Sequence, residues 1–539
     1  MIYISKIHIE NYKCFVKFDM DFHKNTNIIV GDNEAGKSTI LEAINICLSG
    51  LLHGHYLRNE LSEYLFNYQS IADYLKSVKA NKSTIPPSIL IELYLESDEN
   101  SPDLENLKGT GNSAGIDKAG IRLLIEFDNQ YQTQSEYEAL VKKGIYNLPI
   151  EYYKMNWMSF ARDSITARSI PLKPNVIDSL SVKYRNGSDF YISKIINDKL
   201  NDDERIALLQ AYRNLKNDFK KIPELQAINE KINDMAKISD KNVSISVNTA
   251  DVNAWENILM TYFDDIPFHQ IGQGEQSIVK TNLALTNVRQ DIFNVILIEE
   301  PENHLSHTRL NILLKHIGRN NPLNQIIVTT HSSFVANKLK LRNLHFLNDK
   351  KIMGFIDLSE EVQNYFYKLP GYNTLRLLLA KRVVLVEGPS DELIIQKAYR
   401  CRHGKLPIED GIDVISVGLS APRFLELSKT LNIKVAVVTD NDGDRDSNIV
   451  KRYENYDQFK NIKVFSNEDN KQNTLEPSFV ACNTAYEQQI KDLLGYNGNK
   501  SLSEYLQTCK TEWALKVFDS DFDFNFPKYI DDCIEWIIS

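Results

Sequence analysis

Eight residues near the start of the chain, Gly31 to Ser38, fit the pattern Gly-x-x-x-x-Gly-Lys-Ser/Thr without a mismatch. This pattern is typical of a P-loop, whose glycines let backbone N–H groups turn toward nucleotide phosphates at the positive end of a helix. We expect Lys37 to reach the β- and γ-phosphates and the Ser38 hydroxyl to bind Mg²⁺. The residues assigned to this ATP site are Gly31, Asn33, Gly36, Lys37, Ser38 and Thr39.

Two acids end an apolar run far downstream, where Val295 to Ile298 are followed by Glu299 and Glu300. Acids at the carboxyl end of such a strand are placed to hold Mg²⁺ through water and to activate an attacking water. We assign Glu299 to the metal and Glu300 to the water. The alternative, solvated acids that merely end a strand, is disfavoured because a P-loop is present.

Three histidines and a glycine pair surround these acids in the sequence. His331 follows the apolar run that starts at Ile326, where a histidine can sense the γ-phosphate. His304 and His307 follow the acids closely, so we favour a contact at the nucleotide or at a dimer interface over a metal pair. A second phosphate-approaching turn precedes the acids and adds three candidates for nucleotide binding: Gly272, Gly274 and Glu275.

A further group of acids follows two more apolar runs. Val383 to Val386 leads to Glu387, and Val435 to Val438 leads to Asp440 and Asp442. Carboxylates at strand ends bind hard cations such as Mg²⁺ or Mn²⁺, and two such ions stabilise the attacking and leaving oxygens of a phosphodiester. The alternatives are a polar turn or a single Ca²⁺ loop, and the second is disfavoured because the closing Glu of an EF-hand is missing.

The elements that must position these residues alternate between strands and helices. Apolar residues alternate with polar ones at the start of the chain, and helical spacing begins at Lys37, directly after the P-loop glycines. Between about residues 201 and 238 two amphipathic helices are expected, with a break at Pro223. This pair is either a helical subdomain with its own core or an arm that contributes to dimerisation.

The order of P-loop, glycine turn and paired acids resembles that of ABC-type ATPases, in which Gly272-Gln273-Gly274 would be the signature motif. Gly272 stands where Ser is usual in that motif, which puts the strength of its γ-phosphate contact in question. The long separation of P-loop and Glu299 resembles the heads of SMC and RecF proteins, whose two halves flank an insertion. In the ABC family the signature of one head completes the site of another, so the resemblance implies a homodimer or higher homo-oligomer.

Glu-Gly after one strand and Asp-x-Asp after another resemble the Toprim fold of topoisomerases, primases and related nucleases. An ABC-type head followed by Toprim resembles the OLD (overcoming lysogenization defect) family across nearly the whole chain. The resemblance implies a metal-ligand set of Glu387, Asp391, Asp440, Asp442 and Glu476, with Glu392 and Asp444 as spare candidates. It also implies that Lys510 neutralises the phosphate in the transition state, the alternative being a solvated surface charge.

The expected fold is α/β, with a split ABC/SMC-like P-loop ATPase head that carries a helical insertion and is followed by a Toprim α/β domain. The expected domains are residues 1–165 and 246–370 for the two parts of the head, residues 166–245 for the insertion and residues 371–539 for Toprim.

Length and composition agree with this organisation. A chain of 539 residues exceeds what one hydrophobic core usually organises. The net charge of −10 argues against an extended DNA-coating surface but allows a local basic groove. The six cysteines lie far apart and are expected to be free thiols, and Cys401 with His403 lacks a second pair for a metal site. No apolar run is long enough for a membrane span and no signal peptide is recognisable, so we expect a cytoplasmic protein without membrane contact.

The sequence therefore predicts a metal-dependent DNA endonuclease that nicks or cuts duplex DNA under the control of an ATP-binding head dimer. By the family resemblance, the expected setting is anti-phage defence, with a defence-system partner protein or an RNA–DNA element. The alternative is a RecF-like DNA-binding ATPase in repair or sensing, whose Toprim domain only docks nucleic acid or a partner. A topoisomerase is disfavoured because little sequence is left for its tyrosine-bearing domain.

Overall fold

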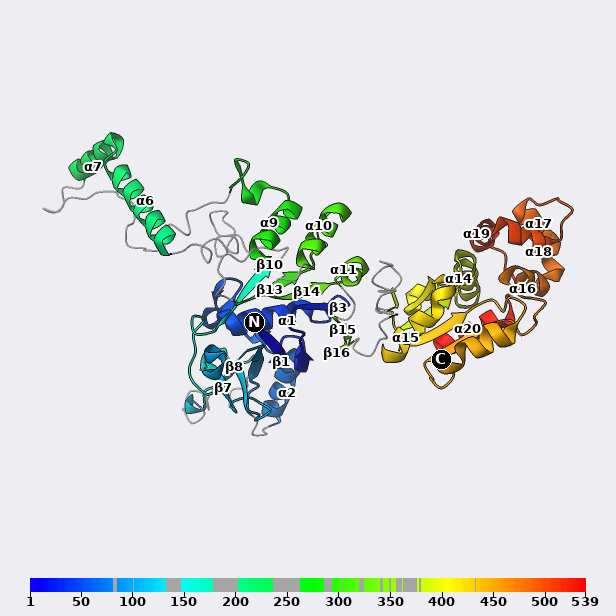
Figure 1. The fold of residues 1–539 in the computed structure, drawn as a ribbon, viewed down its shortest axis with the longest axis horizontal. Coiled ribbons are helices and arrows are strands. Elements are labelled where there is room, and N and C mark those ends of the chain that lie inside the picture. The colour runs from blue at the N-terminus through cyan, green and yellow to red at the C-terminus, as the bar shows by residue number, and fades with distance from the viewer. Residues whose placement is uncertain are drawn as a thin grey trace. The chain divides into compact units, whose positions relative to one another are not determined.

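The chain, seen here in a computed structural model, forms two compact units (Figure 1). One unit contains Met1–Ile29, Asn33–Thr330 and Asp349–Ile352, and the other contains Val30–Asp32, His331–Asn348 and Met353–Ser539. The structure describes residues 1–80, 85–99, 101–131, 147–177, 202–235, 262–285, 293–303, 305–318, 324–339, 343–348, 350–354, 361, 376–377, 380–431 and 433–539.

The first unit begins with an antiparallel sheet in the order β2-β1-β6-β8-β7, with β9 paired to β8. The strands are β1 (Ile2–Tyr12), β2 (Phe15–Asp21), β6 (Ile89–Ser97), β7 (Lys108–Gly109), β8 (Lys118–Phe127) and β9 (Tyr153–Ser159). Ile2, Ile4, Ile7 and Ile9 are all buried although the step from Ile4 to Ile7 breaks the period of two. A register shift between Ile4 and Lys6 accounts for this, because an irregularity there returns the apolar side chains to one face.

A second sheet of six strands contains the run β10-β13-β14-β3, in which β10, β13 and β14 are parallel. The strands are β3 (Thr26–Gly31), β10 (Leu172–Ile177), β13 (Phe293–Glu299) and β14 (Asn324–Thr330), and β15 (Leu344–Asn348) and β16 (Lys351–Gly354) complete the six. Helix α1 (Lys37–Ser49) packs against β6 and β8 of the first sheet and against β10, β13 and β14 of the second. The P-loop helix therefore lies between the two sheets.

Strand β10 lies inside the range expected for the helical insertion. Leu172 to Ile177 pair in parallel with Phe293 to Ile298 of β13. The strand is hard to recognise because Lys173, Pro174 and Asn175 interrupt its apolar residues. The described head sheet therefore includes a strand beyond residue 165.

The remaining helices of this part of the chain include the expected amphipathic pair. They are α2 (Tyr68–Lys79), α3 (Pro102–Glu105), α6 (Asp202–Lys220), α7 (Pro223–Met235), α9 (Gln273–Leu285), α10 (His307–Ile317) and α11 (Ser333–Lys338). Two short hairpins, β4 (Leu51–Leu52) with β5 (His55–Tyr56) and β11 (Tyr262–Phe263) with β12 (Ile266–Pro267), accompany them. Helices α6 and α7 are separated directly before Pro223, as the sequence predicts, because proline lacks the N–H that an unbroken helix needs.

The second unit is organised around a parallel sheet in the order β18-β17-β19-β20. Its strands are β17 (Arg382–Val386), β18 (Ile412–Ser416), β19 (Lys434–Val438) and β20 (Ile462–Phe465). Helices α14 (Pro389–His403), α15 (Ala421–Leu431) and α20 (Lys528–Ile538) pack against these strands. Because β17 and β19 are parallel neighbours, the residues that follow both strands meet at one edge of the sheet.

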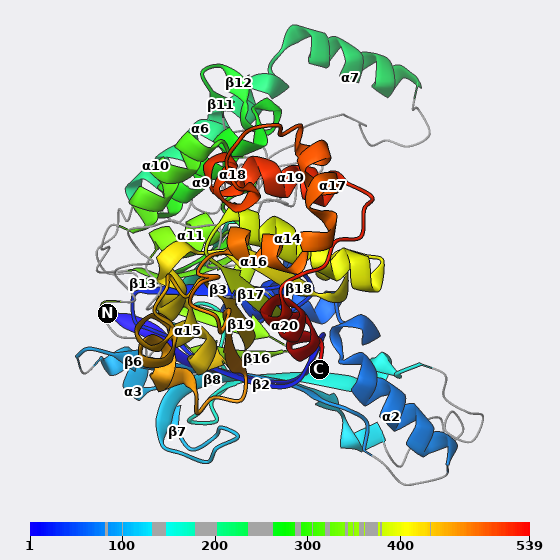
Figure 2. The same ribbon diagram turned by 90° about the vertical axis from the view of Figure 1, so that its right-hand side faces the viewer.

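A group of short helices packs beside this sheet: α16 (Leu475–Cys482), α17 (Glu487–Leu494), α18 (Leu502–Cys509) and α19 (Thr511–Asp519). Figures 1 and 2 both show them gathered near α14. They share one hydrophobic core with the sheet, in which Val384, Phe479 and Trp513 are buried. This core fixes the start of α16, and with it Glu476, relative to the strand ends.

Two further observations concern the cysteines and the helices. All six cysteines are free thiols. None of the helices in the described ranges combines the length and the apolar character that a bilayer span requires.

Candidate active site

The P-loop is the turn between β3, which ends at Gly31, and α1, which begins at Lys37. Gly36 adopts φ 109°, a left-handed conformation that side chains disfavour. A Cβ atom at Gly36 would lie 2.5 Å from Phe15 Cζ and 2.8 Å from Cys14 Sγ, so the position needs glycine for space as well. Lys37, the first residue of α1, is buried.

The two expected Mg²⁺ ligands of the head lie together. Ser38, in the first turn of α1, donates a hydrogen bond from Oγ to Oε1 of Glu299, the last residue of β13. These residues are 261 positions apart, so the contact depends on how α1 packs against the sheet. A hydroxyl and a carboxylate side by side are oxygen ligands of the kind that Mg²⁺ prefers. Thr39 follows and accepts a contact from the thiol of Cys14 at 3.6 Å.

Glu300 has a backbone conformation that is rare for a side-chain-bearing residue, with φ 43°. Its N–H donates to the carbonyl of Thr329 at 2.9 Å, which fixes the turn against β14. Its Oε2 accepts a hydrogen bond from Asn303 Nδ2 at 2.9 Å. The carboxylate is therefore held just beyond Glu299, as a water-activating group would need to be.

The histidines lie on separate elements. His331 is exposed and follows β14 directly. His307 is the first residue of α10, and its Nδ1 lies 3.3 Å from Asn311 Nδ2. His304 lies outside the described residues.

The glycine turn precedes α9 as expected. The Gly272 carbonyl accepts the N–H groups of Glu275 at 2.9 Å and Gln276 at 3.1 Å, so Gly272 caps the helix that contains Gly274. The Glu275 carboxylate is bound by Arg309 of α10 at 2.8 Å. A Cβ atom at Gly272 would meet no atom within 4 Å, so a serine would fit at this position.

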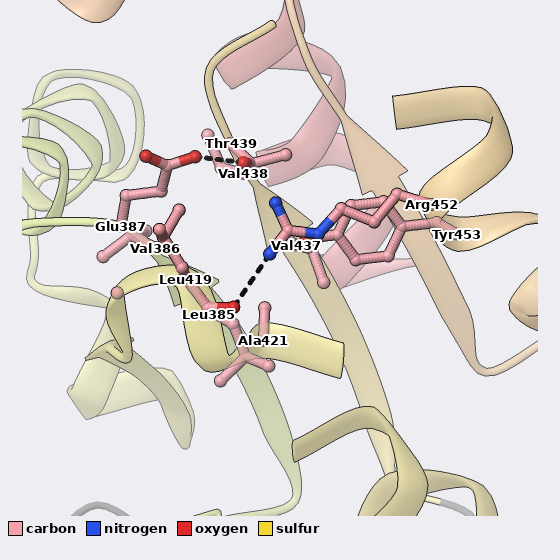
Figure 3. A pocket seen from close by; sticks show the side chains of 11 residues that line it. Leu385, Val386, Glu387, Leu419, Ala421, Val437, Val438, Thr439, Arg452 and Tyr453 are labelled. Carbon is pink, nitrogen blue, oxygen red and sulfur yellow. Dashed lines mark hydrogen bonds between the residues drawn. The ribbon is translucent and has the colours of Figure 1, made fainter. Parts of the chain in front are cut away.

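The acids of the second unit meet at the edge formed by the ends of β17 and β19. Glu387 follows β17, and its Oε1 accepts a hydrogen bond from the Thr439 hydroxyl (Figure 3). The same oxygen accepts the Asp440 N–H at 3.1 Å. Both donors come directly after β19. The parallel pairing of the two strands thus brings together residues that are more than fifty positions apart.

Burial and mutual repulsion perturb the acids of this edge. Burial, together with the charges of Asp391, Glu387, Glu476 and Asp442, raises the pKa of Asp440 to about 9. Burial, reinforced by Glu387 and Glu476 and opposed by a 3.0 Å hydrogen bond from the Gly388 N–H, raises the pKa of Asp391 to about 7. The other four predicted metal ligands are therefore all close enough to act electrostatically on Asp440.

The donor set fits a divalent cation by its chemistry. Over the residues that the structure describes, no three or more His, Cys, Asp or Glu side chains already surround a point where a metal ion would lie. The five acids of this edge nevertheless offer only carboxylate oxygens, the ligands of hard cations such as Mg²⁺ and Mn²⁺. A cation would also remove the repulsion that raises the pKa of Asp440 and Asp391.

The loop after β19 is held by its middle residue, a role that the sequence did not reveal. Asn441 is fully buried, and its amide donates to the carbonyls of Asn467 at 2.9 Å and Asp469 at 3.2 Å. Asp442 is exposed, with φ 48°, and its N–H donates to the carbonyl of Asn473 at 3.1 Å. The burial of Asn441 and its two hydrogen bonds depend on residues far away in the sequence. The sequence Asp-Asn-Asp alone therefore does not indicate this role.

The two spare acids have other partners. Asp444 accepts the Ser447 N–H at 3.1 Å, and hydrogen bonds to Ser447 lower its pKa. Glu392 accepts a hydrogen bond from Gln396 at 3.4 Å and lies 4.0 Å from the Arg376 guanidinium. Neither acid is among the groups that act on Asp440 or Asp391.

Lys510 lies at the junction of α18 and α19, with φ 43° and an exposed side chain. Its N–H donates to the Leu506 carbonyl at 3.0 Å. Within the described ranges its ammonium makes no hydrogen bond or ion pair, so no contact brings it to the acids. Trp513 and Ala514, which follow it, are buried in the core. Its role at the phosphate stays a prediction.

Two family profiles match this chain. The AAA ATPase domain matches residues 2–336, which is more than half of the chain. The Toprim domain of overcoming lysogenization defect protein-like proteins matches residues 378–442, which include Glu387, Asp391, Asp440 and Asp442. The chain therefore belongs to the AAA ATPase domain family and, through its Toprim domain, to the OLD-family nucleases with an ATPase domain. The α/β fold expected from the sequence, an ATPase head followed by Toprim, is confirmed.

The chain is also similar to individual proteins. The chain is 20% identical to Endonuclease GajA of Bacillus cereus (strain HuB5-5) over 94% of this chain and 83% of the relative. It is 22% identical to DNA replication and repair protein RecF of Clostridium beijerinckii over 36% of this chain and 52% of that protein. Among solved structures, the C-terminal region of the Burkholderia pseudomallei OLD protein matches 29% of this chain and 97% of its own length, with 19% identity and a TM-score of 0.24.

Proposed function

We propose that this chain is a metal-dependent DNA endonuclease that nicks or cuts duplex DNA, and that ATP bound by a dimer of its heads controls the cutting. The observation that carries the proposal is the group of carboxylates at the ends of β17 and β19 and the start of α16, four of which repel the buried Asp440. Such a group is costly in a folded protein unless a cation offsets its charge, and it therefore points to function.

In this proposal Glu387, Asp391, Asp440, Asp442 and Glu476 hold Mg²⁺, or Mn²⁺ in its place. Such ions, when bound, stabilise the attacking and leaving oxygens of a phosphodiester. The chain's own contribution is to hold the acids in place, Glu387 through Thr439 and the Asp440 N–H, and Asp391 through the Gly388 N–H. Lys510 is proposed to neutralise the phosphate.

The head is proposed to bind ATP through the P-loop amides and Lys37. Ser38 and Glu299 would bind the Mg²⁺ that accompanies ATP, Glu300 would orient the attacking water, and His331 would sense the γ-phosphate. Each chain has one P-loop and one glycine turn. Gly272, Gly274 and Glu275 of one copy would complete the site of another, so ATP would join two copies.

The proposed setting is anti-phage defence in the cytoplasm, with a partner protein or an RNA–DNA element. The OLD-family Toprim domain and the similarity to Endonuclease GajA over 94% of the chain support it. Similarity to RecF supports the alternative of a DNA-binding ATPase with a non-catalytic Toprim domain. That similarity covers only 36% of the chain, and a docking domain would have no need of a buried Asp440 that is repelled by four other acids.

Supercoiled plasmid tests the proposal when it is incubated with the full chain and Mg²⁺ or Mn²⁺ across an ATP series. We expect nicked or linear product that EDTA prevents, and a cleavage rate that changes with ATP in the wild type but not in Lys37→Ala. Cleavage that persists in EDTA would contradict metal dependence. Failure to cut supercoiled, relaxed and linear DNA with either ion, at any ATP concentration, would favour the RecF-like alternative.

A further inference from the structure

The two carboxylate oxygens of Glu387 have different surroundings. Oε1 accepts two hydrogen bonds, from the Thr439 hydroxyl and from the Asp440 N–H. Oε2 takes part in no hydrogen bond or ion pair with the described residues. One oxygen is therefore anchored to the end of β19, and the other is left for an additional ligand.

The Thr439 hydroxyl that binds Oε1 is itself buried. Thr439 is 7% exposed, and Tyr453, which lines the same small pocket, is 3% exposed. A threonine hydroxyl has one proton, and Thr439 donates it to Glu387. The contact between Thr439 and Glu387 is therefore shielded from solvent on the Thr439 side.

The nearby Arg452 does not replace the Thr439 contact. Arg452, Tyr453, Thr439 and Glu387 line one small pocket at the ends of the strands (Figure 3). The Arg452 guanidinium donates to the carbonyl of Leu419 at 2.8 Å, and among the described residues no ion pair joins it to Glu387. Glu387 is thus oriented by one neutral hydroxyl and one backbone N–H, which fix its direction without neutralising its charge.

We propose that Thr439 is a positioning residue for the metal site, which holds Oε1 of Glu387 so that Oε2 faces the cation. This inference rests on the proposed metal-dependent nuclease. Without the hydroxyl of Thr439, the carboxylate is free to turn away from the neighbouring acids, whose charges repel it. Groups that orient a metal ligand in this way typically change metal affinity by about 10- to 100-fold when they are removed.

Thr439→Val tests the inference, because valine has nearly the shape of threonine and lacks the hydroxyl. Mn²⁺ binding to the full chain is measured by titration without nucleotide or DNA, and the binding that is lost in an Asp440→Ala, Asp442→Ala variant defines the Toprim site. We expect Thr439→Val to raise the dissociation constant of that site about 10- to 100-fold. Saturating Mn²⁺ should restore much of the cleavage rate, because affinity rather than chemistry is affected.

A second variant separates the hydroxyl from packing. Thr439→Ser keeps the hydroxyl and should bind Mn²⁺ like the wild type. ATP hydrolysis and thermal unfolding before metal addition should stay at wild-type values in both variants. Wild-type affinity in Thr439→Val, or equal weakening in Thr439→Ser, would overturn the inference while the nuclease proposal stands. A wild type without a Toprim-dependent Mn²⁺ site would overturn both.

Discussion

Glu300 and Asp442 both adopt left-handed backbone conformations, with φ 43° and 48°, in turns that directly follow strands. Such conformations cost about 1–3 kcal/mol for residues with side chains, and they persist where the surroundings fix them. Here the N–H of Glu300 is bound to the Thr329 carbonyl and that of Asp442 to the Asn473 carbonyl. Two residues assigned to chemistry from the sequence are thus held in unusual conformations, one in each unit.

Glu300→Gln should separate ATP binding from ATP hydrolysis. Glutamine keeps the shape and the hydrogen bond from Asn303 but cannot accept a proton from water, so hydrolysis should fall by about 10²- to 10⁴-fold. ATP binding should remain, and ATP should hold two copies together for longer. Hydrolysis is measured by phosphate release, and assembly by the molecular mass in solution with ATP.

Two control variants accompany that experiment. Glu105→Gln changes an exposed acid at the end of α3, and both hydrolysis and assembly should remain at wild-type values. Lys37→Ala should lose ATP binding and assembly together. Wild-type hydrolysis in Glu300→Gln would show that another group activates the water.

Helix α9 differs from the usual ABC signature motif at Gly272, the residue directly before the helix. Gly272 lies where those ATPases have serine, yet its surroundings leave space for a side chain. Its carbonyl already accepts the N–H groups of the first helical turn, and serine is a favourable residue at this position.

Gly272→Ser should therefore fold normally and strengthen the contact to ATP across the dimer. We expect a lower ATP concentration for half-maximal dimerisation, measured by mass in solution, and an unchanged or slightly raised thermal midpoint. Gly36→Ser is the contrasting change, because its Cβ would collide with Phe15 and Cys14, and it should lose ATP binding. A Gly272→Ser chain that dimerises more weakly than the wild type would contradict the assignment of this turn.

The sequence was sufficient to predict the features that depend on residues close together in the chain. The P-loop turn, the helix break at Pro223 and the acids that follow apolar strands are all of this kind. Strand β10 was missed because its polar residues and proline hide an edge position that only pairing with β13 defines. The bond from Thr439 to Glu387 was missed because it joins residues 52 positions apart through the packing of two strands. In the sequence Asn441 only separates Asp440 from Asp442, but in the structure it is buried and holds its loop in place.

In the whole molecule, one chain joins an ATPase head to a proposed cutting site made of carboxylates. The net charge of −10 gives DNA no general attraction, so binding must depend on local groups and on cations at the acids. ATP that joins two heads would then bring two cutting sites into one assembly. This arrangement gives the nucleotide a physical route to the nuclease.

The most direct test compares plasmid cleavage by the wild type with that by an Asp440→Ala, Asp442→Ala variant and by Asp457→Asn, a matched change of an exposed acid in the same unit. We expect the double variant to lose cleavage by at least about 100-fold while it still hydrolyses ATP, because a metal site without two of its carboxylates cannot stabilise the phosphodiester oxygens. Asp457→Asn should cut like the wild type. Undiminished cleavage by the double variant would show that these acids do not form the cutting site.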